Sequence, residues 1–170
     1  MPKTEIIVIN TAPIIASVSA LGDLTILQSL YTQVLVPFEV CQEVLAGGYS
    51  GFAVAEFEAA NWLKKQQTTL NISPLLLNSL DRGEAAVIQL AMNENIQTVC
   101  IDEVAGRRMA RLSGLSVTGS IGILLRAKRE GHPISMQQAI SQMLNRGIRL
   151  SPTVINFALL QAGENNLSER

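Results

Sequence analysis

The chain has 170 residues, of which 48% are apolar and 16% are charged, so it can bury one sizeable core and is not a disordered polar chain. Its net charge of −1 does not by itself point to a charged partner. We recognise neither a signal peptide nor an apolar run long enough to span a bilayer, and therefore expect a cytoplasmic protein.

Short β-rich segments alternate with helical segments along most of the chain. In chain order we expect a strand at 5–9, helices at 12–21 and 23–30, a strand at 33–36, a helix at 38–46, a Gly-rich loop at 47–51, a helix at 53–65, a strand at 68–72, a helix at 83–94, a strand at 98–101, a helix at 103–113, a strand at 116–118 and a helix at 120–130. This alternation predicts an α/β fold with a mostly parallel central sheet between two helical layers.

Two further helices are expected at the C-terminal end. They cover residues 135–145 and 151–162, and each opens with a serine in the N-cap position. We interpret them as a helical hairpin added to the sheet. Residues 1–150 would then form the α/β domain and residues 151–170 a helix and tail packed on it, within one domain overall. Their apolar faces exceed what a small sheet needs, which favours a homodimer.

The cysteine and histidine content excludes several classes of site. Cys41 and Cys100 lie in apolar segments without metal-ligand spacing, so we expect buried thiols. His132 is the one histidine and lies in a Gly-His-Pro turn. A histidine-based zinc site and a Ser-His-Asp triad are therefore not supported.

Charge is distributed unevenly along the chain. Residues 1–103 contain four Lys or Arg against eleven Asp or Glu, whereas residues 104–150 contain eight Lys or Arg against Glu130 alone. This separation is typical of an acidic site beside a basic track that binds phosphates. The same residues could equally form solvated outer faces of helices, and both interpretations remain open at this point.

Four polar residues lie at the ends of predicted elements, where parallel α/β sheets carry their sites. Asn10 follows the first strand, Asp102 follows the strand at 98–101, Glu43 lies one turn after Glu39 on its helix, and Glu84 opens a helix rich in small residues. Oxygen ligands that converge in one crevice suit a hard divalent cation such as Mg²⁺.

Each of these residues also has a purely structural explanation. The alternatives are a capping box in which Asp81 precedes Glu84, a solvated helix face for Glu39 and Glu43, an Asp102 cap on the helix that begins at Glu103, and a turn at Asn10-Thr11 that caps the next helix. Taken singly, each alternative is favoured over a functional role; taken together, the four positions favour a shared site.

Five segments of the chain resemble the PIN-domain nucleases, and within them a branch of unknown function related to the VapC toxins of toxin–antitoxin pairs. Between residues 6 and 152 they read, in order, VINTAPIIA, LVPFEVCQEVLAGG, LDRGEAAVIQLA, VCIDEVAGRRMARLSGLSVTGSIGILLRAKREG and RGIRLSP. The resemblance implies a Rossmann-like three-layer sandwich with an acidic pocket for Mg²⁺ or Mn²⁺. It further implies metal-assisted RNA cleavage, a dimer and a small antitoxin partner.

The family pattern can be carried over residue by residue. It assigns catalytic carboxylates to Glu43, Glu84 and Asp102, and it offers Glu103 as a further metal ligand. Thr11 lies where the first motif often has a hydroxyl residue. Asn10 occupies the position of the first acid, and this departure affects the centre of the site. Because its amide oxygen can still bind a cation, we expect weaker metal binding rather than none.

These observations lead to three hypotheses. The first is a metal-dependent endoribonuclease, in the manner of a toxin held by an antitoxin, in which Arg107, Arg108 and Arg111 bind the RNA backbone. The second is a catalytically degenerate module of the same fold that binds RNA or a protein partner. The third, a nucleotide-binding α/β protein, lacks support because neither a G-x-G-x-x-G motif nor a P-loop is present.

Overall fold

The structure is a computed structural model that describes residues 5–47 and 51–164. Its strands are β1 (Ile6–Ile9), β2 (Gln33–Val36), β3 (Lys64–Lys65), β4 (Thr98–Cys100) and β5 (Ser116–Thr118). Its helices are α1 (Thr11–Leu21), α2 (Thr25–Leu30), α3 (Phe38–Ala46), α4 (Val54–Ala59), α5 (Pro74–Ser79), α6 (Arg82–Asn93), α7 (Val104–Leu112), α8 (Ser120–Arg129), α9 (Met136–Asn145) and α10 (Pro152–Gln161).

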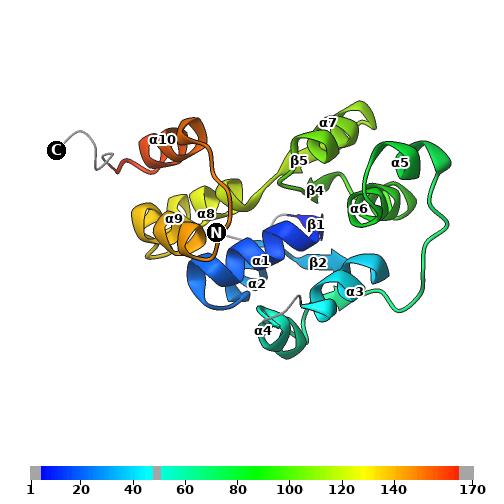
Figure 1. The fold of residues 1–170 in the computed structure, drawn as a ribbon, viewed down its shortest axis with the longest axis horizontal. Helices are drawn as coiled ribbons and strands as arrows, with labels where there is room; N and C mark the ends of the chain where they lie inside the picture. Colours follow the sequence, from blue (N-terminus) through cyan, green and yellow to red (C-terminus); the bar gives the residue numbers. More distant parts are fainter. Residues whose placement is uncertain (1–4, 48–50, 165–170) are drawn as a thin grey trace.

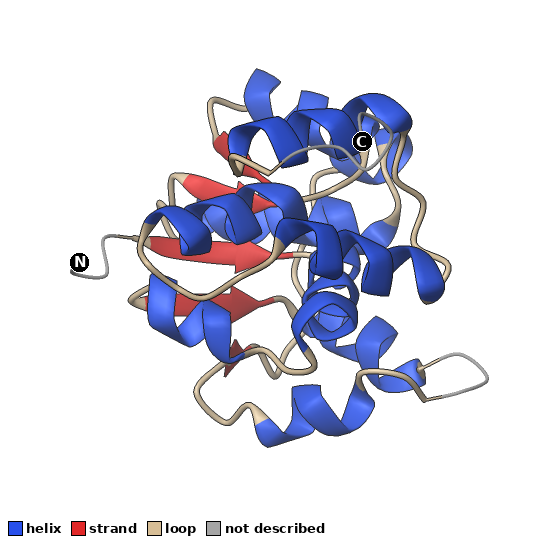
Figure 2. Ribbon diagram, turned by 90° about the vertical axis from the view of Figure 1, so that its left-hand side faces the viewer, coloured by secondary structure: helices blue, strands red, loops and turns tan. Residues whose placement is uncertain are grey.

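The strands form one five-stranded sheet in the order β3-β2-β1-β4-β5, and every pairing is parallel. Helices α5, α6 and α7 lie on one side of this sheet, and α1, α2, α8 and α9 lie on the other (Figure 1). Figure 2 shows the strands running in one direction, with their carboxyl ends along one edge. The predicted α/β fold, a Rossmann-like three-layer arrangement, is confirmed.

The strand order reverses between β1 and β4, because the chain moves outward from β1 through β2 to β3 and then returns to β4 on the other side. Ligand sites of open α/β sheets lie at such a reversal, in the crevice beyond the carboxyl ends of the strands. Asn10 and Asp102 follow the two strands at this point. The topology therefore predicts a ligand site around these two residues.

The central strands are buried on both faces, as expected for a parallel sheet covered by helices. Ile7, Val8 and Ile9 of β1 have no exposed surface, and they belong to the larger of two apolar clusters. A second cluster lies under α8, α9 and α10, where Ala16 and Ala20 of α1 also contribute. The small alanine side chains allow α1 to approach α9 closely.

One region differs from the sequence prediction. The helix expected at 53–65 ends at Ala59, and the edge strand β3 is Lys64–Lys65 rather than residues 68–72. Within the described residues, 68–72 has no strand partner; its backbone at Leu70 instead donates to a side chain, Oε2 of Glu39 (3.0 Å). Two lysines on a very short edge strand also discourage pairing with another chain.

The remaining elements agree with the prediction to within two residues at each end, and α5 was not anticipated. Cys41 and Cys100 are buried free thiols, as predicted. Part of the expected Gly-rich loop (48–50) and the expected C-terminal tail (165–170) lie outside the described residues. In the portion that is described, no helix has both the length and the apolar character needed to cross a membrane.

Candidate metal site

Asn10 and Asp102 both lie at the carboxyl edge of the sheet, beyond the ends of β1 and β4. The hydrogen-bond ladder continues past the strands, since Asn10 N donates to the carbonyl of Cys100 (3.0 Å) and Ile101 N donates to the carbonyl of Thr118 (3.0 Å). Both residues therefore leave their strands at the same edge, as the sequence suggested. Asn10 occupies the N-cap position of α1 but makes no side-chain capping bond, so the capping explanation for this residue is wrong.

Glu43 of α3 reaches the side chain of Asn10 across the first turn of α6. A methyl group placed on Gly83 would lie 2.5 Å from Oε1 of Glu43 and 3.1 Å from Oδ1 of Asn10. The hydroxyl of Thr11 donates to the other Glu43 oxygen, Oε2, at 2.7 Å. The absence of a side chain at Gly83 thus leaves space for Asn10 and Glu43, two of the four predicted site residues. The hydrogen bond from Thr11 orients the carboxylate of Glu43.

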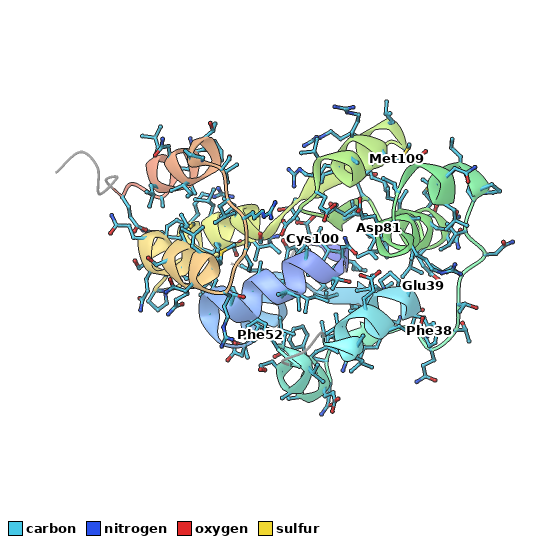
Figure 3. The ribbon with its side chains drawn as sticks, viewed as in Figure 1. Phe38, Glu39, Phe52, Asp81, Cys100 and Met109 are labelled. Atoms are coloured by element: carbon cyan, nitrogen blue, oxygen red, sulfur yellow. The ribbon has the colours of Figure 1, made fainter. Side chains whose placement is uncertain are left out.

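Glu84 is joined by two further carboxylates, those of Asp81 and Glu103. One oxygen from each of the three side chains lies within 4.8 Å of the others. Asp81 is the N-cap of α6 and its side chain accepts a hydrogen bond from Glu84 N (2.9 Å), which is the Asp81 half of the capping box predicted there. Figure 3 labels Asp81 beside α6.

The environment of Glu84 disfavours its charge. Its side chain is 3% exposed, and Oε2 fills the space where Gly106 of α7 lacks a side chain. Burial, together with hydrogen bonding and repulsion from Asp81 and Glu103, raises the pKa of Glu84 to about 8. Without a cation, Glu84 therefore holds a proton at neutral pH.

No N–H or O–H group of the described residues donates to Oδ1 of Asn10 or to Oε2 of Glu84 at this edge. The hydrogen bonds of Glu84 with Asp81 and Glu103 are between carboxyl groups and need a proton. An unpaired buried oxygen is costly, by about 1–3 kcal/mol, and needs an explanation. Carboxylate and amide oxygens are the donors that Mg²⁺ and Mn²⁺ accept. The residues present therefore fit a hard divalent cation.

Asp102 is held by the beginning of α8 rather than by α7. Its Oδ1 accepts from Ser120 N (2.7 Å) and its Oδ2 from the Ser120 hydroxyl (2.9 Å). The N-cap of α7 is Glu103, so the expectation that Asp102 caps that helix is wrong. A methyl group on Gly119 would lie 2.7 Å from Oδ1 of Asp102, which again makes glycine necessary for the close approach.

Three arginines follow the acidic edge along α7. Arg107 Nη1 donates to the carbonyl of Ile101 (2.8 Å) and lies as near to Gly119 as Asp102 does. Arg107, Arg108 and Arg111 line a surface depression of about 400 Å³ together with Val104 and Leu112. The basic residues that the sequence singled out thus form one surface that begins beside Asp102.

Glu39 does not lie on a solvated helix face, contrary to that structural alternative. It is 3% exposed, and Figure 3 shows it where α3 and α6 lie together. Its role is to hold the segment after β3 through Leu70 N, as described above. Glu43, one turn later on α3, is exposed.

Sequence reasoning missed Asp81 and Ser120 as members of this edge. Asp81 was interpreted only as a cap, although one carboxylate can cap a helix with one oxygen and present the other elsewhere. The signal for Ser120 was its place two residues after the last strand, in register with Asp102. The glycines at 83, 106 and 119 each remove a side chain where a site residue would collide with it.

Comparison with known proteins adds one match. A protein-family model described as a PIN domain matches residues 6–164. A search of curated proteins returns no match.

Proposed function

The chain belongs to the PIN-domain family, and from this premise we propose that it is a metal-dependent endoribonuclease whose site is weakened by Asn10. The observation that carries the proposal is the pair of buried, unpartnered oxygens on Asn10 and Glu84 at the reversal point of a parallel sheet. A nuclease-type fold alone would not indicate a working site. Beside further carboxylates, oxygens that are buried without a donor favour a cation.

We assign the cation to Glu43, Glu84 and Asp102, with the amide oxygen of Asn10 and the carboxylate of Glu103 as further ligands. When bound, Mg²⁺ or Mn²⁺ supplies Lewis-acid neutralisation of the charge that develops at a phosphodiester and makes a nearby water more acidic. Mn²⁺ is expected to bind more tightly, because affinity at oxygen sites rises along the divalent series and Mg²⁺ loses its waters reluctantly.

The chain's own residues orient these ligands. Thr11 fixes one oxygen of Glu43 by a hydrogen bond, and Ser120 fixes both oxygens of Asp102. Hydrogen bonds to ligating carboxylates generally contribute to metal affinity, since they reduce the freedom that is lost on binding. Glu84 must release its proton from the carboxyl group before it can act as a ligand.

RNA is the proposed substrate because a basic surface adjoins the acidic edge. Arg107, Arg108 and Arg111 line one depression on α7, and Arg107 lies beside Asp102. A phosphate bound by these guanidinium groups would bring the neighbouring phosphodiester towards the carboxylates. We further propose that the protein acts in the cytoplasm as the toxin of a toxin–antitoxin pair, held by a small protein.

We also propose that the active form is a homodimer. Helix α10 carries no charged residue, and Phe157 and Leu160 on it are 53% and 76% exposed. Large exposed apolar side chains on one helix are typical of an interface. Light scattering should give twice the monomer mass at micromolar concentration, and a monomer at all concentrations would contradict the dimer.

A second candidate is a catalytically degenerate PIN module that binds RNA or a protein. Asn10 favours it, because the position central to the site has lost its charge. In that case the arginine surface on α7 would bind RNA without cleavage.

An RNA cleavage assay separates the two candidates. Fluorescent single-stranded RNA is incubated with the wild-type protein in Mn²⁺, in Mg²⁺ or in chelator, alongside Glu43→Gln. A matched control is Glu58→Gln, which changes an exposed glutamate on α4. The nuclease proposal expects cleavage that needs a cation, is lost in Glu43→Gln and persists in Glu58→Gln. RNA binding with no cleavage in either metal supports the degenerate module.

A further inference from the structure

We propose that a second pocket of this protein binds an alkylguanidinium cation, the group that ends an arginine side chain. The pocket has a volume of about 330 Å³ and lies between the turn that joins α1 to α2 and helix α4, so we call it the α4 pocket. Its polar wall consists of the carboxylates of Asp23 and Glu56 and the hydroxyl of Thr25. The indole of Trp62 and small or branched apolar side chains form the rest.

The α4 pocket is separate from the candidate metal site. Asp23 lies beyond the end of α1, and Trp62 lies two residues before β3, so the pocket is near the edge of the sheet where the strands begin. Asn10 and Asp102 lie at the opposite, carboxyl edge. Figure 1 shows α4 well apart from α6 and α7. The inference therefore does not depend on a metal, on RNA or on the proposed function.

Glu56 carries a charge that its surroundings do not balance. Its Oε2 is buried and accepts no hydrogen bond, and neither Glu56 nor Asp23 forms an ion pair within the part of the chain that the structure describes. Lys65, three residues after Trp62, donates instead to the carbonyl of Phe57 (2.8 Å). The first turn of α4 favours an acid at this position but does not supply the missing donor. A cation in the adjoining pocket would neutralise this carboxylate.

The groups around the pocket favour a planar organic cation. The face of the Trp62 indole attracts cations, and a guanidinium group also stacks on aromatic rings. Asp23 uses Oδ1 for Thr25 N (3.0 Å) and for the Thr25 hydroxyl (2.8 Å), so its other oxygen remains available. Because a guanidinium carries five N–H donors, it can bind two carboxylates at once.

The same wall disfavours other classes of ligand. Two carboxylates repel a phosphate or another anion, and none of the described residues that line the pocket is a lysine or arginine that could bind one. The volume is at the lower end of the range of ligand pockets, which is roughly 300–1,000 Å³. A cation of side-chain size, with an alkyl stem against the apolar wall, therefore suits the pocket best.

Trp62 is the single tryptophan of the chain, so its indole N–H signal in NMR spectra reports directly on the α4 pocket. Three probes with the same alkyl stem separate charge from shape: propylguanidinium, propylammonium and the neutral propylurea. We expect a saturable shift of the indole signal with propylguanidinium, weaker binding of propylammonium and no binding of propylurea. Equal shifts with propylurea, or no shift with any probe, would overturn the proposal.

Charge-removing variants test the two carboxylates. Glu56→Gln keeps the shape of the side chain, and Glu58→Gln, which changes an exposed glutamate on the same helix, is the matched control. Affinity for propylguanidinium should fall by about tenfold in Glu56→Gln and stay unchanged in Glu58→Gln. If Glu56→Gln does not fold, Asp23→Asn gives a second readout, since asparagine keeps an oxygen for Thr25 N. Wild-type affinity in Asp23→Asn and in a folded Glu56→Gln would contradict the assignment.

The guanidinium group can come from free arginine or from an arginine of a partner protein, and two further ligands distinguish these sources. N-acetyl-arginine amide lacks the terminal charges of the amino acid, as an arginine within a protein chain does. Binding of free arginine that is tighter by about tenfold or more would identify the amino acid as the ligand. Equal or tighter binding of the blocked form would identify a protein side chain. Binding of neither would exclude arginine and overturn the proposal.

Discussion

The side chains of Asn10 and Glu43 approach each other where Gly83 has no side chain. Their oxygens Oδ1 and Oε1 lie 3.1 Å and 2.5 Å from the position that a methyl group on Gly83 would take. One residue follows the central strand and the other lies on α3, so a glycine in the first turn of α6 is what lets them meet. The space beside Gly83 therefore brings together residues from three parts of the fold that are far apart in the sequence.

Gly83→Ala should separate metal binding from stability. The added methyl group displaces the flexible end of Glu43, which costs the fold little, while alanine in a helix is favoured over glycine by about 1 kcal/mol. We expect an unchanged or slightly raised melting temperature and Mn²⁺ binding weakened by about tenfold, because one ligand is lost or displaced. Calorimetry and thermal melting measure the two effects. Unchanged Mn²⁺ affinity would show that the oxygens around Gly83 are not ligands.

Mn²⁺ affinity should rise with pH. Because the pKa of Glu84 is raised to about 8, a proton must leave before a cation can bind its carboxylate. Affinity should increase by at most about tenfold per pH unit between pH 6 and 8 and level off above that range. The Mn²⁺ affinity that Glu84→Gln retains should not depend on pH over this range. An unchanged pH dependence in that variant would show that Glu84 is not the titrating group.

The contribution of Glu84 to the stability of the metal-free protein should fall as pH rises. The folded-state pKa of Glu84 lies above its ordinary value of 4.5, so the folded chain binds more protons between these limits. The contribution of Glu84 to the free energy of unfolding is complete below pH 4.5 and is lost as pH rises through about 8. Urea unfolding of wild type and Glu84→Gln at several pH values gives the free energy of unfolding of each protein. The value for Glu84→Gln should rise relative to that of wild type as pH rises.

Thr11→Val should weaken metal binding without breaking the fold. The variant removes the hydroxyl that holds Oε2 of Glu43 at 2.7 Å. A hydrogen bond of this kind contributes about 1 kcal/mol, so we expect Mn²⁺ affinity to fall by roughly fivefold. Thr25→Val is the matched control, because the Thr25 hydroxyl donates to Oδ1 of Asp23 at 2.8 Å, outside the site. Equal losses in both variants would count against an orienting role for Thr11.

Much of the fold could be predicted from the sequence because the apolar pattern of its strands and the caps of its helices are local signals. The region between α4 and α6 was predicted wrongly because such local signals do not determine which segments pair in the sheet. A run such as 68–72 has the composition of a strand, but in the fold its Leu70 N donates to Glu39, a residue distant in the sequence. Likewise Asp102 precedes α7 in sequence yet binds α8, which only the register of β4 and β5 determines.

The candidate site was predictable in part. The positions of Asn10, Glu43, Glu84 and Asp102 follow from strand and helix ends together with the family pattern. Asp81 was not recognised, since a capping box explains it fully at the level of sequence. Its proximity to Glu103 arises from the packing of α6 against α7, for which the sequence offers no local signal.

The central claim is that this is a metal-dependent nuclease site limited by the missing charge at position 10. The most direct test is the rate of single-stranded RNA cleavage in Mn²⁺ by Asn10→Asp, compared with wild type and with Asp102→Asn. A unit charge pair at about 4 Å is worth roughly 4 kcal/mol at an effective dielectric constant near 20, and desolvation of the carboxylate offsets much of this gain. We predict faster cleavage by Asn10→Asp than by wild type and none by Asp102→Asn. Equal RNA binding by all three proteins, with no cleavage by any of them, would contradict the claim.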